Sequence, residues 1–216
     1  MIYCNILILN IQLLCQKLHL TKKCTFAKMK NEYRLYMIML GCRPQGRYTE
    51  QHDIFFGIGT SLKQLIPNMK AFWPEAKGKI HIDAWREVTL VDSYQIEISP
   101  KNEGIQSENN LFFINLGGYK ENEFEEYHYK VLAIGETLAE ASKKAKATTF
   151  YKHCGFKGAT SHIDDKYGID IDDAFNVKEI ISQVFKDNFD ISITKNNSDL
   201  EEDILHIGYL KLDKIV

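Results

Sequence analysis

The chain has few cysteines, no marked excess of charge of one sign and no long apolar run. Only five of its 216 residues are cysteine, and none form a Cys-x-x-Cys pair. This excludes a disulfide framework and favours the reducing cytoplasm. Lys and Arg number 27 against 29 Asp and Glu, so no basic excess favours a nucleic-acid partner. No apolar run approaches the roughly 18 to 20 residues that cross a bilayer, so we expect no membrane partner.

The first 28 residues form a leader of doubtful status. Residues 2–15 are mostly apolar, but the positive charges follow this run instead of preceding it, and no small-residue cleavage site comes after it. A secretory signal has the opposite order. We therefore expect translation to start at Met29, with residues 1–28 as upstream sequence. The alternatives are a membrane-surface anchor and an export signal.

The rest of the chain contains an internal repeat. A shift of 76 positions (111 − 35) places LYMIMLG at 35–41 on LFFINLG at 111–117. The same shift places Glu50-x-His52 on Glu126-x-His128. After a five-residue insertion, the His-Ile-Asp run at 81–83 meets the His-Ile-Asp run at 162–164. Matches that recur in this order predict a duplication.

Each copy predicts the same order of elements: a buried strand, a polar turn, a second strand, a helix and two further strands. Capping boxes that begin at Ser61 and Thr137 start the two helices. The predicted strands span 35–40, 51–59, 79–90 and 92–98 in the first copy, and 111–116, 127–135, 160–171 and 173–177 in the second. A helix at 177–186 and strands at 189–194 and 205–212 follow. The sequence thus predicts an α+β fold, in which two ββαββ units pack with pseudo-twofold symmetry before a C-terminal helix and strands.

The domain boundaries follow from this repeat. We expect a first repeat at 29–98, a polar linker at 99–110, a second repeat at 111–177 and a C-terminal extension at 178–216.

The first copy resembles a known family. Its string LYMIMLGCRPQGRYTEQHDIFFGIG, followed by KIHIDAW, is similar to the bacterial family called domain of unknown function 1543. The resemblance covers about 35–98 and, more loosely, 111–177. It implies one or two tandem copies of a short domain in a bacterial protein, and it carries no established activity.

Two pairs of polar residues are candidates for a metal or catalytic site. Glu50 and His52 project from one face of the second strand, and His81 and Asp83 share a face of the third, because residues two apart on a strand point the same way. If these strands are neighbours, two imidazoles and two carboxylates converge. Such a set suits a divalent ion such as zinc, iron or manganese, or metal-free acid–base catalysis. It is equally typical of hydrogen bonds that tie strands together. In the second copy, the same residue types recur as Glu126, His128, His162 and Asp164.

A second candidate site lies in the first polar turn. Arg43 and Arg47 flank this turn, and two guanidinium groups can hold a phosphate or carboxylate. Trp85 is a candidate for covering the ligand. The alternatives are a solvated turn or an Arg–Glu contact between the copies for the arginines, and a core position for Trp85.

Three functions fit these residues. The first is a binding or interaction module that holds a small anionic ligand at the first repeat. The second is a metal-dependent enzyme that uses Glu50, His52, His81 and Asp83, with Arg43 and Arg47 anchoring an anionic substrate. The third is a structural subunit that forms a homo-oligomer through exposed sheet edges.

Overall fold

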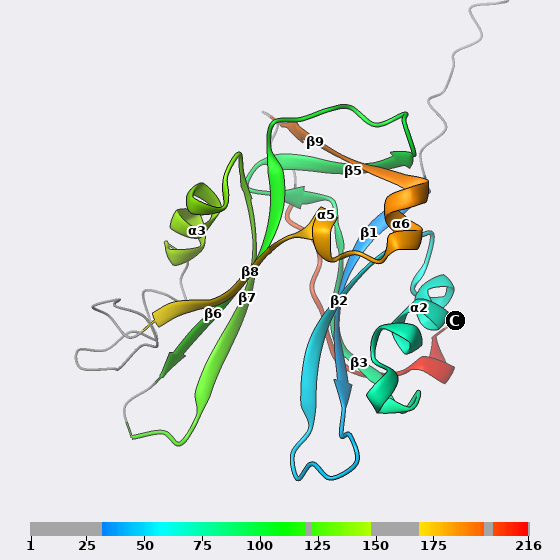
Figure 1. The fold of residues 1–216 in the computed structure, drawn as a ribbon, viewed down its shortest axis with the longest axis vertical. Coiled ribbons are helices and arrows are strands. Elements are labelled where there is room, and N and C mark those ends of the chain that lie inside the picture. The colour runs from blue at the N-terminus through cyan, green and yellow to red at the C-terminus, as the bar shows by residue number, and fades with distance from the viewer. Residues whose placement is uncertain (1–31, 120–121, 148–168, 197–200, 216) are drawn as a thin grey trace, which may run out of the picture. The chain divides into compact units, whose positions relative to one another are not determined.

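The computed structural model describes residues 32–119, 122–147, 169–196 and 201–215, so the leader at 1–28 and Met29 lie outside the described residues. These residues form an α+β fold in which antiparallel strands dominate (Figure 1). None of the helices that the structure describes has the length and apolar character needed to cross a bilayer.

The largest sheet has four strands in the order β10-β3-β1-β2. Its strands are β1 (Arg34–Cys42), β2 (Gln51–Gly59), β3 (His81–Val88) and β10 (His206–Lys211). Helix α2 (Leu62–Phe72) follows β2 and leads through a 3-10 turn (Pro74–Ala76) to β3. The C-terminal strand β10 therefore completes a sheet whose other strands come from the first third of the described chain.

The second sheet has three strands in the order β7-β6-β8. They are β6 (Asn110–Tyr119), β7 (Glu126–Gly135) and β8 (Ile169–Asn176), with helix α3 (Leu138–Lys146) after β7. A third sheet, in the order β4-β5-β9, joins β4 (Leu90–Val91) and β5 (Tyr94–Pro100) to β9 (Phe189–Lys195).

The first two sheets share one register. In the first sheet, Gly41 on β1 lies opposite His52 on β2; in the second, Gly117 on β6 lies opposite His128 on β7. The third strand of each sheet pairs with the first strand through a bulge at matching places, Met39/Leu40 and Asn115/Leu116. Bulges of this kind change the direction in which side chains point and are common next to functional sites.

The capping boxes begin both helices as predicted. Ser61 Oγ accepts a hydrogen bond from the Gln64 amide, and Thr137 Oγ1 accepts one from the Glu140 amide. Gln64 and Glu140 reach back one residue further than a standard capping box, to the amides of Thr60 and Glu136. The two helices differ in bulk, since α2 buries Leu62, Leu65 and Met69 whereas α3 buries Ala141 and Ala145.

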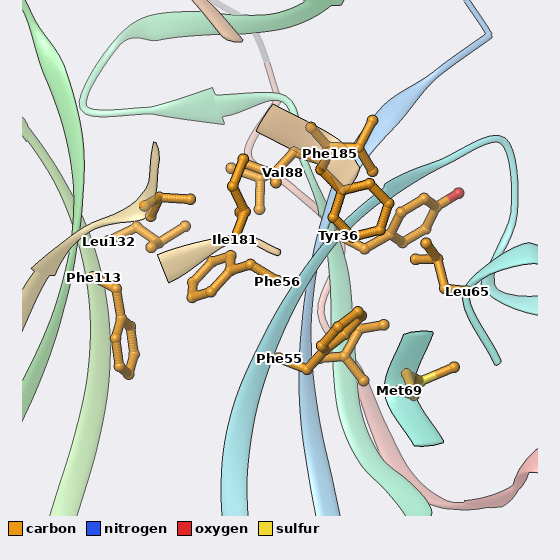
Figure 2. Close-up of a cluster of buried hydrophobic side chains, with 14 of the residues drawn as sticks. Tyr36, Phe55, Phe56, Leu65, Met69, Val88, Phe113, Leu132, Ile181 and Phe185 are labelled. Atoms are coloured by element: carbon orange, nitrogen blue, oxygen red, sulfur yellow. The ribbon is translucent and has the colours of Figure 1, made fainter. Parts of the chain in front are cut away.

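The main core joins the first sheet, α2, the third sheet and one face of the second sheet (Figure 2). Phe55 packs edge-on against Phe72 of α2, while its neighbour Phe56 points the other way and packs edge-on against Phe113 of β6, with ring centroids 5.6 Å apart. The opposite face of β6, with Phe112, Ile114 and Leu116, packs against the alanines of α3. The faces of the two sheets that lack a helix therefore meet at Phe56 and Phe113.

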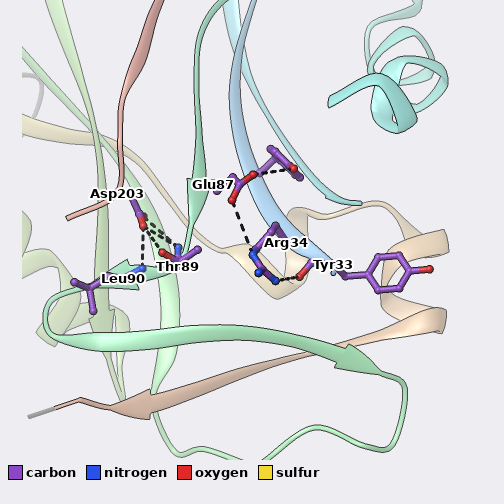
Figure 3. Close-up of polar contacts among 7 residues, drawn as sticks. Tyr33, Arg34, Glu87, Thr89, Leu90 and Asp203 are labelled. Atoms are coloured by element: carbon purple, nitrogen blue, oxygen red, sulfur yellow. Dashed lines mark hydrogen bonds and ion pairs between the residues drawn. The ribbon is translucent and has the colours of Figure 1, made fainter. Parts of the chain in front are cut away.

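The segment before β10 is tied to the first sheet by a buried carboxylate. Asp203, whose side chain is 2% exposed, accepts hydrogen bonds from the amides of Thr89 and Leu90 and from the Thr89 hydroxyl (Figure 3). The guanidinium of Arg86 lies 3.8 Å from the same carboxylate. These contacts fix the approach of the C-terminal strand to β3.

Two predicted elements differ in the structure. The second copy was expected to have a fourth strand at 173–177, but these residues are the end of β8 and its junction with α5 (Val177–Ile180), because β8 keeps pairing with β6 as far as Phe112 and Asn176. The helix expected at 177–186 is two short helices, α5 and α6 (Gln183–Asn188), because Ile181 and Ser182 between them adopt extended backbone. The predicted strand at 160–168 lies outside the described residues.

Candidate metal centre

Four side chains from two strands meet at one end of the first sheet. Glu50 immediately precedes β2, His52 lies on β2, and His81 and Asp83 lie on β3. Strand β1 separates β2 from β3, so the two pairs meet across Gly41. The sequence predicted this convergence only if β2 and β3 were neighbours. The structure brings the pairs together although one strand lies between them.

Short contacts join the four side chains in a closed ring, called the first ligand set below. His81 Nε2 lies 3.1 Å from Glu50 Oε1 and 3.2 Å from Asp83 Oδ2. His52 Nε2 lies 3.2 Å from the same Asp83 oxygen and 3.9 Å from Glu50 Oε2. Donor atoms bound to one ion at about 2.0 to 2.2 Å are themselves about 3 to 3.5 Å apart, so the three shorter separations suit shared coordination and the 3.9 Å separation is longer.

Gly41 provides the space for this ring. A Cβ atom on Gly41 would lie 2.2 Å from Asp83 Oδ2 and 2.4 Å from His81 Nε2, closer than any real Cβ contact. The side chains of β3 therefore extend over β1 only because position 41 has none. The bulge between Met39 and Leu40 accommodates Asp83 as the additional residue on β3.

Two of the atoms that could bind a metal in this set are buried without a hydrogen-bond partner. They are His81 Nε2 and Asp83 Oδ2, which lie 3.2 Å apart in an orientation that does not meet hydrogen-bond geometry. An unsatisfied buried polar atom costs about 1 to 3 kcal/mol. A cation between the two atoms would remove that cost.

The other side of the set is open to solvent. The side chains of Glu50 and His52 are 45% and 40% exposed, whereas His81 is 10% exposed. Met39 and Ile54, the next residues along β1 and β2 on the same face, line a cavity of about 860 Å³. The four ligand residues themselves do not line this cavity.

Tyr209 of β10 lies over the buried histidine. Its ring centroid is 4.4 Å from that of His81. The register of β10 with β3 shifts between Ile207 and Leu210, and Gly208 within this irregularity has φ +136. An L side chain rarely adopts that backbone, so the glycine permits the irregularity that places Tyr209 here.

The anion-binding residues predicted from sequence are not gathered in one place. Arg43 and Arg47 are exposed in the turn between β1 and β2. Trp85 pairs with Ile38, five residues along β1 from Arg43, a separation of about 16 Å. Trp85 instead stacks on His206 with ring centroids 3.8 Å apart, and it packs against the core.

Residue Cys42 lies beside the set but does not belong to it. The thiol is buried, and burial, with a further contribution from Glu50, raises its pKa. A higher pKa makes the thiolate less available.

Sequence reasoning missed Gly41 and Tyr209. A signal for Gly41 was present, because Gly41 and Gly117 coincide when the sequence is shifted by 76 positions. Tyr209 had no such signal. Of the corresponding residues in the predicted second repeat, Glu126 and His128 lie on β7, while His162 and Asp164 lie outside the described residues.

Residues 47–98 match the model of a family described as Domain of Unknown Function (DUF1543). This range holds the entire first ligand set, and the match confirms the resemblance for that part of the first repeat. The chain is also similar to the crystal structure of protein Il1583 from Idiomarina loihiensis, with a TM-score of 0.56 and 19% identity over 83% of this chain and 98% of that one. At this identity the similarity concerns the fold. No curated protein matches the chain.

Proposed function

We propose that the first ligand set, Glu50, His52, His81 and Asp83, binds one divalent transition-metal ion. The observation that carries the proposal is the pair of buried donor atoms, His81 Nε2 and Asp83 Oδ2, that face each other without a hydrogen bond. Two imidazoles and two carboxylates are ligands that suit zinc, iron and manganese. Strand-to-strand hydrogen bonds, the structural alternative, would satisfy these atoms instead of leaving them unpartnered.

The exposed side of the set supports a role in chemistry as well as in stability. Structural zinc sites are closed by four protein ligands, whereas catalytic sites keep a position for water or substrate, so an ion held by all four residues would react only by expanding to five ligands or by releasing an exposed one. Glu50 and His52 are substantially exposed, and the cavity of about 860 Å³ adjoins the same face. A bound ion would polarise a ligand or lower the pKa of a water there. We therefore favour a metal-dependent enzyme over a purely structural centre.

The arginine turn has an accessory role in this proposal. Arg43 and Arg47 belong to the turn that leads into Glu50, and both are exposed. Two guanidinium groups near a cation suit an anionic ligand. Phosphate binding, measured calorimetrically with and without bound zinc, tests this role: Arg43→Ala with Arg47→Ala should weaken it in the zinc-loaded protein. Equal phosphate binding by the wild type and this variant would contradict it.

The shared register of the two sheets supports the duplication. β1–β2 and β6–β7 pair identically after a shift of 76 residues, with the bulge at the matching place. We infer that the two sheets are copies of one unit related by pseudo-twofold symmetry.

One observation favours assembly through a sheet edge. Strand β10 is an edge of the four-stranded sheet, and Ile207 and Tyr209 on it are 82% and 63% exposed. Exposed apolar edge strands are templates for pairing with another chain. Light scattering of the wild type and of Ile207→Lys tests whether a homo-oligomer forms through this strand. A wild-type monomer, or an oligomer that the substitution leaves intact, would contradict it.

Metal content tests the main proposal. The full chain, purified without chelators and then exposed to zinc, should lose about one zinc equivalent when His52→Ala and His81→Ala are combined. Gln51→Ala is the matched control, because residue 51 lies between Glu50 and His52 but points to the other face. Unchanged zinc content in the double variant, with folding verified by circular dichroism, would overturn the proposal.

A further inference from the structure

The second sheet carries its own group of metal-ligand side chains, called the second ligand set below. It consists of Glu126 and His128 on β7 and Asp172 on β8, each of which offers a donor atom within 4.8 Å of the others. His128 Nε2 lies 3.2 Å from Asp172 Oδ2, the separation found between His52 and Asp83 in the first set. These residues are partly exposed, with side-chain exposures of 35% for His128 and 21% for Asp172.

A glycine again provides the space. A Cβ atom on Gly117 would lie 2.3 Å from Asp172 Oδ2 and 2.6 Å from Asp172 Oδ1. Gly117 lies opposite His128, as Gly41 lies opposite His52. The carboxylate of β8 thus extends across β6 toward the histidine of β7 by the same device that the first sheet uses.

One position on the third strand carries different residue types in the two sheets. In the first sheet His81 pairs with Gly41, and in the second Asp170 pairs with Gly117. The bulge then places Asp172 where the first sheet has Asp83. The repeat in the sequence predicted His162 and Asp164 for these positions, and the strand pairing assigns them to Asp170 and Asp172 instead. A backbone position that holds an imidazole residue in the first sheet therefore holds a carboxylate residue in the second.

A tyrosine orients one of the carboxylates. The Tyr119 hydroxyl donates a 2.8 Å hydrogen bond to Glu126 Oε1. Partners that hydrogen-bond to a ligating carboxylate fix its direction and support metal affinity.

We propose that the second ligand set binds a divalent cation of the harder manganese type. Imidazole-rich sets suit zinc, whereas carboxylate-rich sets suit manganese, calcium and magnesium. The second set has one imidazole and two carboxylates. The proposal rests on its own contacts and does not require that the first set binds zinc.

Manganese titration followed by electron paramagnetic resonance tests the second set, because the signal of free Mn²⁺ decreases as the ion binds to the protein. The full chain is first loaded with zinc and then titrated with Mn²⁺. His128→Ala combined with Asp172→Asn should weaken Mn²⁺ binding at least about 10-fold while zinc content stays unchanged. Tyr127→Phe is the matched control, since residue 127 lies between Glu126 and His128 and points to the other face.

The outcomes separate the two proposals. Loss of Mn²⁺ binding in His128→Ala with Asp172→Asn, but not in His52→Ala with His81→Ala, supports the second site even if zinc never binds. The proposed second site is overturned if Mn²⁺ binding survives in His128→Ala with Asp172→Asn. It is also overturned if Mn²⁺ binding is lost only in His52→Ala with His81→Ala. Asp172→Asn alone preserves side-chain volume, so it tests the site should the double variant fail to fold.

Discussion

The two sheets share a register but differ in what surrounds it. In the first sheet, the ligand set has two histidines, Tyr209 from a fourth strand covers one of them, and α2 buries Leu65 and Met69 behind the sheet. In the second sheet, the set has one histidine, α3 buries only alanines, and β8 is an outer strand. Strand pairing thus sets where ligands can meet, while packing around the strands sets how buried they are and which ion they suit.

Core truncation should show the largest difference between the sheets. Met69→Ala removes a fully buried side chain behind the first sheet and should lower the free energy of unfolding by about 2 to 5 kcal/mol. Ala141→Gly, the corresponding change behind the second sheet, removes only one methyl group and should cost about 0.5 to 1 kcal/mol, mainly because glycine is a poor helix former. Urea unfolding measures both. Equal losses would show that the two helices stabilise their sheets to the same degree.

Substitutions of Gly41 and Gly117 should each affect the binding of a different ion. Gly41→Ala places a methyl group against Asp83 and His81 and should weaken zinc binding on the order of 100-fold, whereas Gly117→Ala should leave zinc binding unchanged and weaken Mn²⁺ binding instead. Calorimetry with each ion on each variant measures this. The comparison fails if either substitution affects both ions equally or neither ion at all.

Alkaline pH should distinguish the two cores, because Tyr36 of the first sheet has Phe112 at the matching position of the second. Burial, the charge of Glu87 and a hydrogen bond to Glu87 raise the pKa of Tyr36 to about 12. The phenol must stay neutral in the folded chain, so its contribution is complete below pH 10 and declines as the pH rises from 10 to 12.

Two pKa units correspond to about 2.7 kcal/mol. Tyr36→Phe, which makes the first sheet resemble the second, should remove this part of the alkaline decline in the free energy of unfolding. A denaturation series between pH 9 and pH 11 measures the onset of the decline. Identical slopes for the wild type and the variant would mean that Tyr36 does not titrate with folding.

Removal of the Tyr209 ring that covers His81 should have the smallest of these effects. Tyr209→Ala exposes His81 and should weaken zinc binding about 2- to 5-fold, since an aromatic pair contributes about 0.5 to 1 kcal/mol. Mn²⁺ binding at the second set, which belongs to the other sheet, should not change. If Tyr209→Ala weakens only Mn²⁺ binding, the assignment of Tyr209 to the first ligand set is wrong.

Much of the local structure could be predicted from the sequence. The near-continuous apolar runs at 35–41 and 111–117 predicted β1 and β6, and the capping boxes at Ser61 and Thr137 predicted α2 and α3. The i, i+2 spacing of Glu50 with His52 correctly placed both side chains on one face. These features depend on neighbours in the chain, which is why local patterns sufficed.

The third strand of the second sheet could not be predicted in the same way. The His-Ile-Asp run at 162–164 matches 81–83 letter for letter, yet Asp170 pairs with Gly117 and Asp172 is the extra residue at the bulge. Strand register depends on the total pairing along β6, and local identity over three residues does not decide it. The expected fourth strand is absent for the same reason. Its residues continue the pairing of β8 with β6 as far as Asn176.

By itself, the sequence determined the residue types and their spacing: histidine and carboxylate pairs two residues apart, glycines at 41 and 117, and apolar strands that must be buried. Only the tertiary structure decided that Glu50 and His52 meet His81 and Asp83 across β1, that Tyr209 from the C-terminal strand covers His81, and that Asp172 completes the second set. The reason is physical. Spacing along a strand follows from backbone geometry, whereas contacts between strands far apart in the chain follow from the pairing and packing of the whole fold.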